Sequence, residues 1–237
     1  MILCIRKRTI QRFFFLFSAV LTGFFLLHSN ETTVPAFLPS STGQGRVLVI
    51  DAGHGGEDGG AVALDGSVSE SSINLAVALR VNDLMRLLGQ PTIMTRTQDI
   101  SIHSAQAKGI REKKASDLQN RAALVNEQDC ACLLSIHQNS LPSSTVTHGA
   151  QVFPNRRKGA DLWAQEVQNA LNRAVNKGNE TRTKPIADTI YLMNHITAPG
   201  ILVECGFLSN TRETDLLQQE TYQLRLATAI TAGCKNA

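Results

Sequence analysis

Two histidines and two glutamates in this 237-residue chain stand at positions where they could share one site. His54, His137 and Glu204 each come just after a short apolar run, and Glu70 begins a segment with helical spacing. Two imidazoles and one carboxylate are typical ligands of a catalytic zinc ion, which keeps water in its open position. A second carboxylate beside that water can act as a base. The residue types therefore predict hydrolytic chemistry at a zinc ion.

Residue type alone supports the four assignments unequally. A lone histidine at a strand end is more often hydrogen-bonded to the backbone than a metal ligand. Two histidines at equivalent strand ends favour a shared site. Glu204 stands in an apolar stretch, where a carboxylate is costly unless it is paired or bound to a metal. Glu70 stays undecided, because helix N-termini commonly carry Glu. The competitors of Glu70 are Glu57, Asp58 and Asp65, and the weaker histidines are His28, His103, His148 and His195.

The surrounding sequence alternates apolar, β-branched runs with segments of helical periodicity. This alternation predicts one α/β domain of three layers with a mostly parallel or mixed central sheet. In such sheets ligands bind beyond the carboxyl ends of the strands, so we expect the zinc site there. Strands are expected at 47–50, 92–95, 130–136, 149–153, 189–193 and 200–203, helices at 71–88, 117–127, 158–176, 211–219 and 220–232, and a long surface loop at 97–116.

The amino-terminal segment resembles a targeting sequence. Four cations within the first twelve residues precede a fifteen-residue apolar run at 13–27, which is short for a membrane span of ~20 residues. We interpret 1–36 as a signal peptide or a membrane anchor, 37–45 as a linker and 46–237 as the catalytic domain. The small residues around Ala36 offer only a weak cleavage site, because Pro35 precedes it. Either way, the domain is expected outside the cytoplasm.

Composition and charge exclude several classes of protein. A chain with 43% hydrophobic and 18% charged residues is typical of a folded enzyme. The net charge is +3, but four of the 23 basic residues lie in the leader, and the remaining 19 balance the 20 acidic ones. Without a basic face on the domain, nucleic acid is not expected as a partner. The cysteines form no Cys-x-x-Cys pair and no disulfide framework; they are Cys4, Cys130, Cys132, Cys205 and Cys234.

Four motifs in this order resemble the zinc N-acetylmuramoyl-L-alanine amidases of the amidase-3 type. They are VIDAGHGG at 49–56, ESSINL at 70–75, SIHQN at 135–139 and LVECGFLSN at 202–210. The resemblance covers 46 to the C-terminus and implies that His54, Glu70 and His137 bind one zinc ion. It also implies that Glu204 is the catalytic acid and base, and that the substrate is the amide between the lactyl group of N-acetylmuramic acid and L-alanine. The chain departs from the family at Ala52, usually proline, and at Ser71, often lysine.

Within the family, the segments 190–195 and 198–200 resemble the sporulation and germination amidases. That resemblance implies action on spore cortex peptidoglycan, where removal of the stem peptide prepares muramic lactam formation. The expected partners are peptidoglycan glycan strands and an envelope lipoprotein or another activating protein. The interval between His137 and Glu204 leaves little room for a covering segment, so we expect an open site. Asn139 and Arg121 are candidates for substrate binding, equally well explained as a loop cap and a solvent-facing arginine.

Two other functions use the same residues. A zinc carboxypeptidase, or another metallopeptidase, also combines histidine and glutamate ligands with a glutamate base. A degenerate amidase would only bind the cell wall, without catalysis. Such a non-catalytic wall-binding module is expected to have lost a ligand or the base, whereas His54, Glu70, His137 and Glu204 are all present.

Overall fold

A computed structural model describes residues 46–129 and 131–236 of the chain. The predictions for 1–36 and for the linker at 37–45 therefore lie outside the described residues, as do Cys4 and Cys130. No helix among the described residues is long and apolar enough to cross a membrane. Cys132, Cys205 and Cys234 are free thiols.

The centre of the domain is a five-stranded mixed sheet with the strand order β2-β1-β3-β5-β4. Strands β2, β1, β3 and β5 are parallel, and β4 at the edge pairs antiparallel with β5. The sequence predicted this mostly parallel sheet correctly. The strands are β1 (Leu48–Ala52), β2 (Thr92–Met94), β3 (Cys132–Asn139), β4 (Gln151–Pro154) and β5 (Gly200–Phe207).

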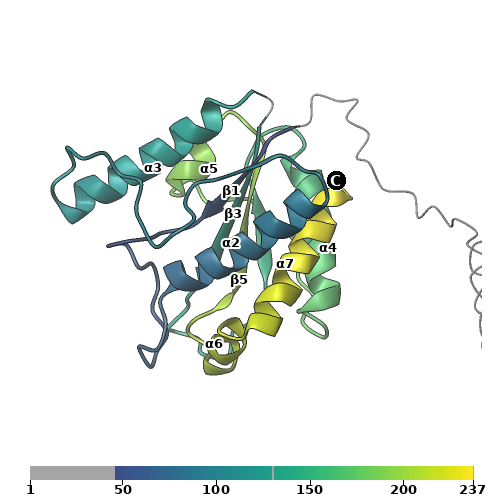
Figure 1. Cartoon of the computed structure of the whole chain (residues 1–237). Coiled ribbons are helices and arrows are strands. Elements are labelled where there is room, and N and C mark those ends of the chain that lie inside the picture. Colours follow the sequence, from purple (N-terminus) through teal and green to yellow (C-terminus); the bar gives the residue numbers. More distant parts are fainter. Residues whose placement is uncertain (1–45, 130, 237) are drawn as a thin grey trace, which may run out of the picture. The chain divides into compact units, whose positions relative to one another are not determined.

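Helices cover both faces of the sheet and make the three expected layers. Helices α2, α4 and α7 pack together on one face, whereas α3 and α5 lie against the other (Figure 1). Helix α6 follows β5 directly and leads into α7. The helices are α2 (Glu70–Leu87), α3 (Ile110–Asn126), α4 (Ala160–Ala174), α5 (Tyr191–His195), α6 (Thr211–Leu217) and α7 (Glu220–Lys235).

The pleat of the strands divides the apolar core into two clusters. Leu48 and Ile50 belong to the cluster under α2, α4 and α7, whereas Val49 between them belongs to the cluster under α3 and α5. Successive side chains of a strand point to opposite faces of the sheet. A strand that is buried on both faces is therefore a continuous apolar run in the sequence. This explains why the apolar runs of the sequence predicted the strands well.

The α3 and α5 face of the sheet changes from apolar to polar toward the carboxyl ends of the strands. Asp51 of β1 is in register with Ser135 of β3, and His137 of β3 is in register with Glu204 of β5. Because side chains alternate, Ser135 and His137 lie on the same face as Leu133. The sheet register therefore brings His137 and Glu204 together at one edge of the sheet.

Two predicted elements are wrong. Residues 189–193 do not form a strand, because they turn into α5 at Tyr191. The loop predicted at 97–116 ends early, because α3 begins at Ile110 rather than near Asp117. The first turn of α3 is polar and exposed, so it lacks the apolar periodicity that marks a buried helix, although its residues are good helix formers.

The packing of α4 against α7 depends on a glycine. A Cβ atom at Gly233 would overlap the backbone of Val167 and lie 2.9 Å from the carbonyl oxygen of Glu166. We predict that Gly233→Ala forces the helices apart and lowers the free energy of unfolding by about 1–3 kcal/mol. Chemical denaturation measures the change, with Ala232→Ser on the exposed side of the same turn as the control. An unchanged stability of Gly233→Ala would contradict this packing.

Candidate metal centre

The loop after β1 presents His54 in an unusual backbone conformation. His54 has a φ of 61°, in the left-handed region that residues with a side chain seldom adopt. Such conformations cost about 1–3 kcal/mol and are kept where the surroundings fix them, often at functional sites. Gly53 before it packs so closely on the His137 ring that a Cβ atom would overlap the imidazole. The loop is therefore shaped to bring the two histidines together.

Glu70 at the start of α2 lies between the two imidazoles. Its Oε1 is 2.8 Å from Nδ1 of His137, and its Oε2 is 3.3 Å from Nε2 of His54. Oε2 also accepts a hydrogen bond from the backbone N–H of Ala61, and Oε1 accepts one from the side chain of Asn74. Burial raises the pKa of Glu70, but the histidines outweigh it and hold that pKa well below its usual range. The carboxylate is thus fixed in its ionised form.

Asp58 orients His54. Its Oδ2 is 2.9 Å from Nδ1 of His54, which leaves Nε2 directed at Glu70. Burial lowers the pKa of His54, but hydrogen bonds to Asp58 and Glu70 outweigh it and raise the pKa to about 9. Asp58 also pairs with Lys114 of α3 at 3.1 Å. A carboxylate on the second nitrogen of a metal-binding histidine is a common means of fixing the ring orientation.

Glu204 carries a buried carboxylate oxygen without a partner. Its Oε2 accepts no hydrogen bond, and the side chain lies beside His137 across the β3–β5 pair. Burial raises the pKa of Glu204 to about 7, although His137 opposes the change. A buried, unpaired carboxylate costs folding free energy unless another group meets it. Glu204 therefore has the properties of a group kept for chemistry rather than for stability.

The three side chains His54, Glu70 and His137 can hold a metal ion. Each offers one ligand atom, and these atoms all lie within 4.8 Å of one another. The imidazole rings of His54 and His137 stand edge to face with their centroids 5.1 Å apart. Two imidazole nitrogens and a carboxylate oxygen are a donor set that suits zinc. The unpaired oxygen of Glu204 leaves an acceptor for water beside this group.

Arg121 does not face solvent and is not free to bind a ligand carboxylate, so both sequence interpretations of this residue are wrong. It is buried, and its Nη1 and Nε form ion pairs of 2.6 Å with Asp51 and Asp117. Its remaining donors go to Asp117 and to the carbonyl oxygens of Ala52 and His54. All five N–H groups of the guanidinium are thus used within the protein.

A second buried arginine, Arg96, holds the same loop from the other side. Its Nε donates to the carbonyl oxygen of Ala52, and its Nη2 donates to those of Gly53 and Ser71. Together with Arg121, it binds every backbone carbonyl from Ala52 to His54. These charge-assisted hydrogen bonds fix the strained loop that carries His54.

The metal centre lies at the bottom of a cavity of about 350 Å³. The side chains of His54 and His137 are 18% and 20% exposed, so the cavity reaches solvent. Lys114 and Leu118 of α3 form one wall, and residues 189–193, which lead into α5, form another. Asn139 is not among the lining residues, and its Oδ1 accepts a hydrogen bond from the backbone N–H of Ser140. Its role in substrate binding stays a prediction.

Comparisons with known proteins identify the family. The family model described as N-acetylmuramoyl-L-alanine amidase matches residues 48–236. The chain belongs to this family. It is 37% identical, over 86% of its length and 84% of the relative, to the germination-specific N-acetylmuramoyl-L-alanine amidase of Bacillus subtilis.

Solved structures agree with this placement of the amidase. The CwlD amidase from Clostridioides difficile, in complex with the GerS lipoprotein, matches with a TM-score of 0.75 and 36% identity, over 81% of this chain and 97% of that one. The catalytic domain of CwlV from Bacillus (Paenibacillus) polymyxa matches with a TM-score of 0.65 and 26% identity, over 81% and 97% of the two chains. The protein is thus an N-acetylmuramoyl-L-alanine amidase that acts on peptidoglycan. The family match, with His54, Glu70, His137 and Glu204 all present, favours the amidase over the carboxypeptidase and the non-catalytic wall-binding module.

Sequence reasoning missed the residues that support the metal-binding group of the amidase. Asp58 was considered only as a competitor of Glu70, and Arg96 was assigned no role. The spacing of four residues between His54 and Asp58 (H-x-x-x-D), within a glycine-rich loop, was a usable signal. No local signal marked Arg96, because its partners lie up to 44 residues away.

Substitution of Arg121 tests whether its hydrogen bonds to the carbonyl oxygens of Ala52 and His54 are needed to hold the His54 loop. We predict that Arg121→Lys weakens zinc binding and lowers the free energy of unfolding by about 3–5 kcal/mol, because an ammonium cannot serve two aspartates and two carbonyls. Thermal denaturation and zinc competition with a chelator measure both effects. Arg111→Lys, exposed on the same helix, is the control. Wild-type zinc affinity in Arg121→Lys would show that the hydrogen bonds of Arg121 to the His54 loop are not needed for zinc binding.

Removal of the charge at Asp58 tests the orientation of His54. We predict that Asp58→Asn lowers zinc affinity by about 10–100-fold, since the neutral amide polarises the imidazole less. The same competition assay measures the affinity. Asp65→Asn, an exposed substitution in the loop that precedes α2, should bind zinc like the wild type. Equal affinities of the two variants would refute a positioning role for Asp58.

Proposed function

We propose that the protein is a zinc amidase in which His54, Glu70 and His137 bind one zinc ion and Glu204 is the catalytic acid and base. The observation that carries this proposal is the buried, unpaired Oε2 of Glu204, next to His137 of the three side chains that can hold a metal. The His₂Glu donor set favours zinc over harder cations such as magnesium, which prefer oxygen ligands. When bound, zinc polarises the scissile carbonyl and lowers the pKa of water toward ~7.

The reaction is hydrolysis of the amide between the lactyl group of N-acetylmuramic acid and L-alanine. Glu204 accepts a proton from the attacking water, whose oxygen forms a bond to the lactyl carbonyl carbon. The carbon–nitrogen bond then breaks, and Glu204 returns the proton to the alanine nitrogen. A pKa near 7 suits both steps, because the same group must take and release a proton near neutral pH.

The scaffold contributes orientation to this reaction. Asp58 holds the His54 ring, and the hydrogen bonds from Ala61 and Asn74 hold Glu70. The walls formed by α3 and by residues 189–193 restrict how a glycan strand can enter. Fixed ligands need no rearrangement when the substrate arrives, which lowers the barrier to the reaction.

We further propose that the substrate is spore cortex peptidoglycan, where stem removal precedes formation of the muramic lactam, and that the protein also acts in germination. The support is its 37% identity to a germination-specific amidase and its similarity to the CwlD amidase. Since that CwlD structure contains the GerS lipoprotein, we propose an envelope lipoprotein as partner. The proposed location is extracytoplasmic, with 1–36 as signal peptide or anchor, 37–45 as linker and 46–237 as catalytic domain.

Product analysis tests the proposed reaction and substrate. The zinc-loaded full chain is incubated with purified peptidoglycan from spores and, in parallel, from vegetative cells. Mass spectrometry should find stem peptides that begin with L-alanine, together with peptide-free glycan, and more of both from cortex. Glu204→Gln, which keeps the three zinc ligands, should bind zinc and release no peptide. Release by that variant would overturn the role of Glu204, and a preference for vegetative wall would overturn the cortex assignment.

The raised pKa of Glu204 also predicts a pH-dependent stability. Below its ordinary pKa of 4.5 the carboxyl is neutral in both states and costs nothing, whereas the cost of ionisation is complete once the pH has passed about 7. In chelator-treated protein, Glu204→Gln should therefore raise the free energy of unfolding at about pH 8, relative to about pH 5, by roughly 2–3 kcal/mol. Urea denaturation at both pH values measures this. If the free energies of unfolding of Glu204→Gln and the wild type differed by the same amount at both pH values, ionisation of Glu204 would carry no such cost.

A further inference from the structure

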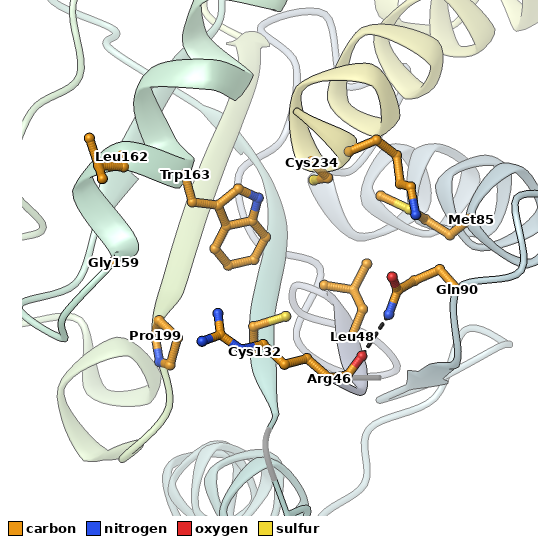
Figure 2. A pocket seen from close by; sticks show the side chains of 11 residues that line it. Arg46, Leu48, Met85, Gln90, Cys132, Gly159, Leu162, Trp163, Pro199 and Cys234 are labelled. Atoms are coloured by element: carbon orange, nitrogen blue, oxygen red, sulfur yellow. Dashed lines mark hydrogen bonds between the residues drawn. The ribbon is translucent and has the colours of Figure 1, made fainter. Parts of the chain in front are cut away.

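A second cavity lies at the amino-terminal ends of the strands, opposite to the carboxyl ends that carry the candidate metal centre. It measures about 340 Å³ and is lined at the amino-terminal ends of β1 and β3, near residues Leu48 and Cys132. Figure 2 shows Trp163 of α4 pointing into this space toward Cys132. No residue of the metal centre contributes to it. The lining residues are Arg46, Leu48, Met85, Gln90, Cys132, Gly159, Leu162, Trp163, Pro199, Cys234 and Lys235.

The interior of this cavity is apolar. Leu48, Met85 and Trp163 supply hydrocarbon and aromatic surface. Burial raises the pKa of the Cys132 thiol to about 11 and that of the Cys234 thiol to about 12. Both thiols are therefore neutral at physiological pH and act as small apolar groups. The volume is within the range of pockets that accept small apolar ligands.

Two cations are the only lining groups that are charged at neutral pH. Arg46 and Lys235 are both exposed, and among residues 46–129 and 131–236 no carboxylate lines the cavity. Leu162 at the mouth is 70% exposed, and Leu87, two residues after the lining Met85, is 81% exposed. Exposed leucines together with cations are typical of surfaces that lie on the headgroup region of an anionic membrane.

The position of this surface in the chain agrees with such a partner. Arg46 is the residue at which the polypeptide enters the domain from the apolar run at 13–27. Only 18 residues, 28–45, separate the two, and fully extended they span at most ~60 Å. While that run is attached and inserted in a bilayer, the domain stays within reach of the membrane surface.

We propose that this cavity and its rim are a membrane-docking surface, in which Arg46 and Lys235 bind phospholipid phosphates and the apolar interior takes part of an acyl chain. Strand β3 runs from Cys132 at the docking surface to His137 near its carboxyl end. Docking therefore directs the candidate metal centre away from the bilayer. The catalytic cavity then faces the peptidoglycan. The proposal concerns a surface that is separate from the catalytic site and does not depend on the metal or on the cortex substrate.

Trp163 provides a direct probe, because it is the only tryptophan in the chain. The full chain is reconstituted in vesicles of phosphatidylcholine, with or without phosphatidylglycerol, whose acyl chains are brominated. The leader inserts in both kinds of vesicle, so only docking distinguishes them. We expect strong quenching of Trp163 emission with phosphatidylglycerol and little without it. Absence of quenching in the anionic vesicles, or equal quenching in both kinds, would overturn the proposal.

Reversal of the charges at Arg46 and Lys235 distinguishes docking of the domain from attachment through the apolar run at 13–27. Arg46→Glu combined with Lys235→Glu should reduce the docked fraction on the order of tenfold or more, since each cation contributes to the attraction. Arg212→Glu combined with Lys177→Glu, at exposed positions outside this surface, should be quenched like the wild type. A second variant, Leu162→Ser, should also reduce quenching. Release of stem peptides from dispersed peptidoglycan fragments should stay unchanged in all variants, which verifies that they fold.

The same experiment identifies other occupants of the cavity. Trp163 emission that changes with protein concentration, and not with lipid composition, would assign the surface to a second copy of the chain and contradict membrane docking. Quenching in the charge-reversed variant equal to that of the control would contradict the role given to Arg46 and Lys235.

Discussion

Two buried guanidinium groups hold the backbone that carries His54 of the candidate metal centre. Arg96 and Arg121 donate to every carbonyl oxygen from Ala52 to His54, in a segment where His54 has a left-handed backbone. The carbonyl of Gly53 also accepts a hydrogen bond from Asn74, whereas those of Ala52 and His54 receive side-chain donors only from the arginines. A buried carbonyl left without a partner costs about 1–3 kcal/mol. Asp51 and Asp117 balance the charge of Arg121. The guanidinium geometry matters here, because a lysine offers neither the fork nor five donors.

The strands carry their buried polar side chains on one face of the sheet. Toward α2, α4 and α7, the strands present an apolar cluster that supplies most of the hydrophobic stabilisation. Toward α3, the carboxyl ends of β1, β3 and β5 carry Asp51, Ser135, His137 and Glu204. The apolar cluster is thus concentrated on one face, whereas the polar side chains of the strands gather at their carboxyl ends on the other, where Glu70 from α2 meets them. Among these side chains Glu204 carries a folding cost, because its Oε2 is buried and accepts no hydrogen bond from the described residues.

The sequence predicted the parallel sheet and the convergence of His54, His137 and Glu204, because polar residues after buried strands must meet at one edge. Glu70 was decided only by the family resemblance, since its neighbours in the loop offered the same chemistry. Helix α5 was mistaken for a strand because a five-residue segment is too short to show a helical period. Arg121 was read as exposed or ligand-binding because its partner Asp51 is 70 residues away, a pairing that only the fold reveals.

The coordination of the bound metal tests the account most directly. Zinc K-edge X-ray absorption on the zinc-loaded full chain should show only nitrogen and oxygen ligands at about 2.0–2.2 Å, with the multiple scattering of two imidazoles. The histidine signal should halve in His137→Ala. Sulfur scattering at about 2.3 Å would instead place the metal on one or more of the five cysteines of the chain. That result would contradict a metal centre formed by His54, Glu70 and His137.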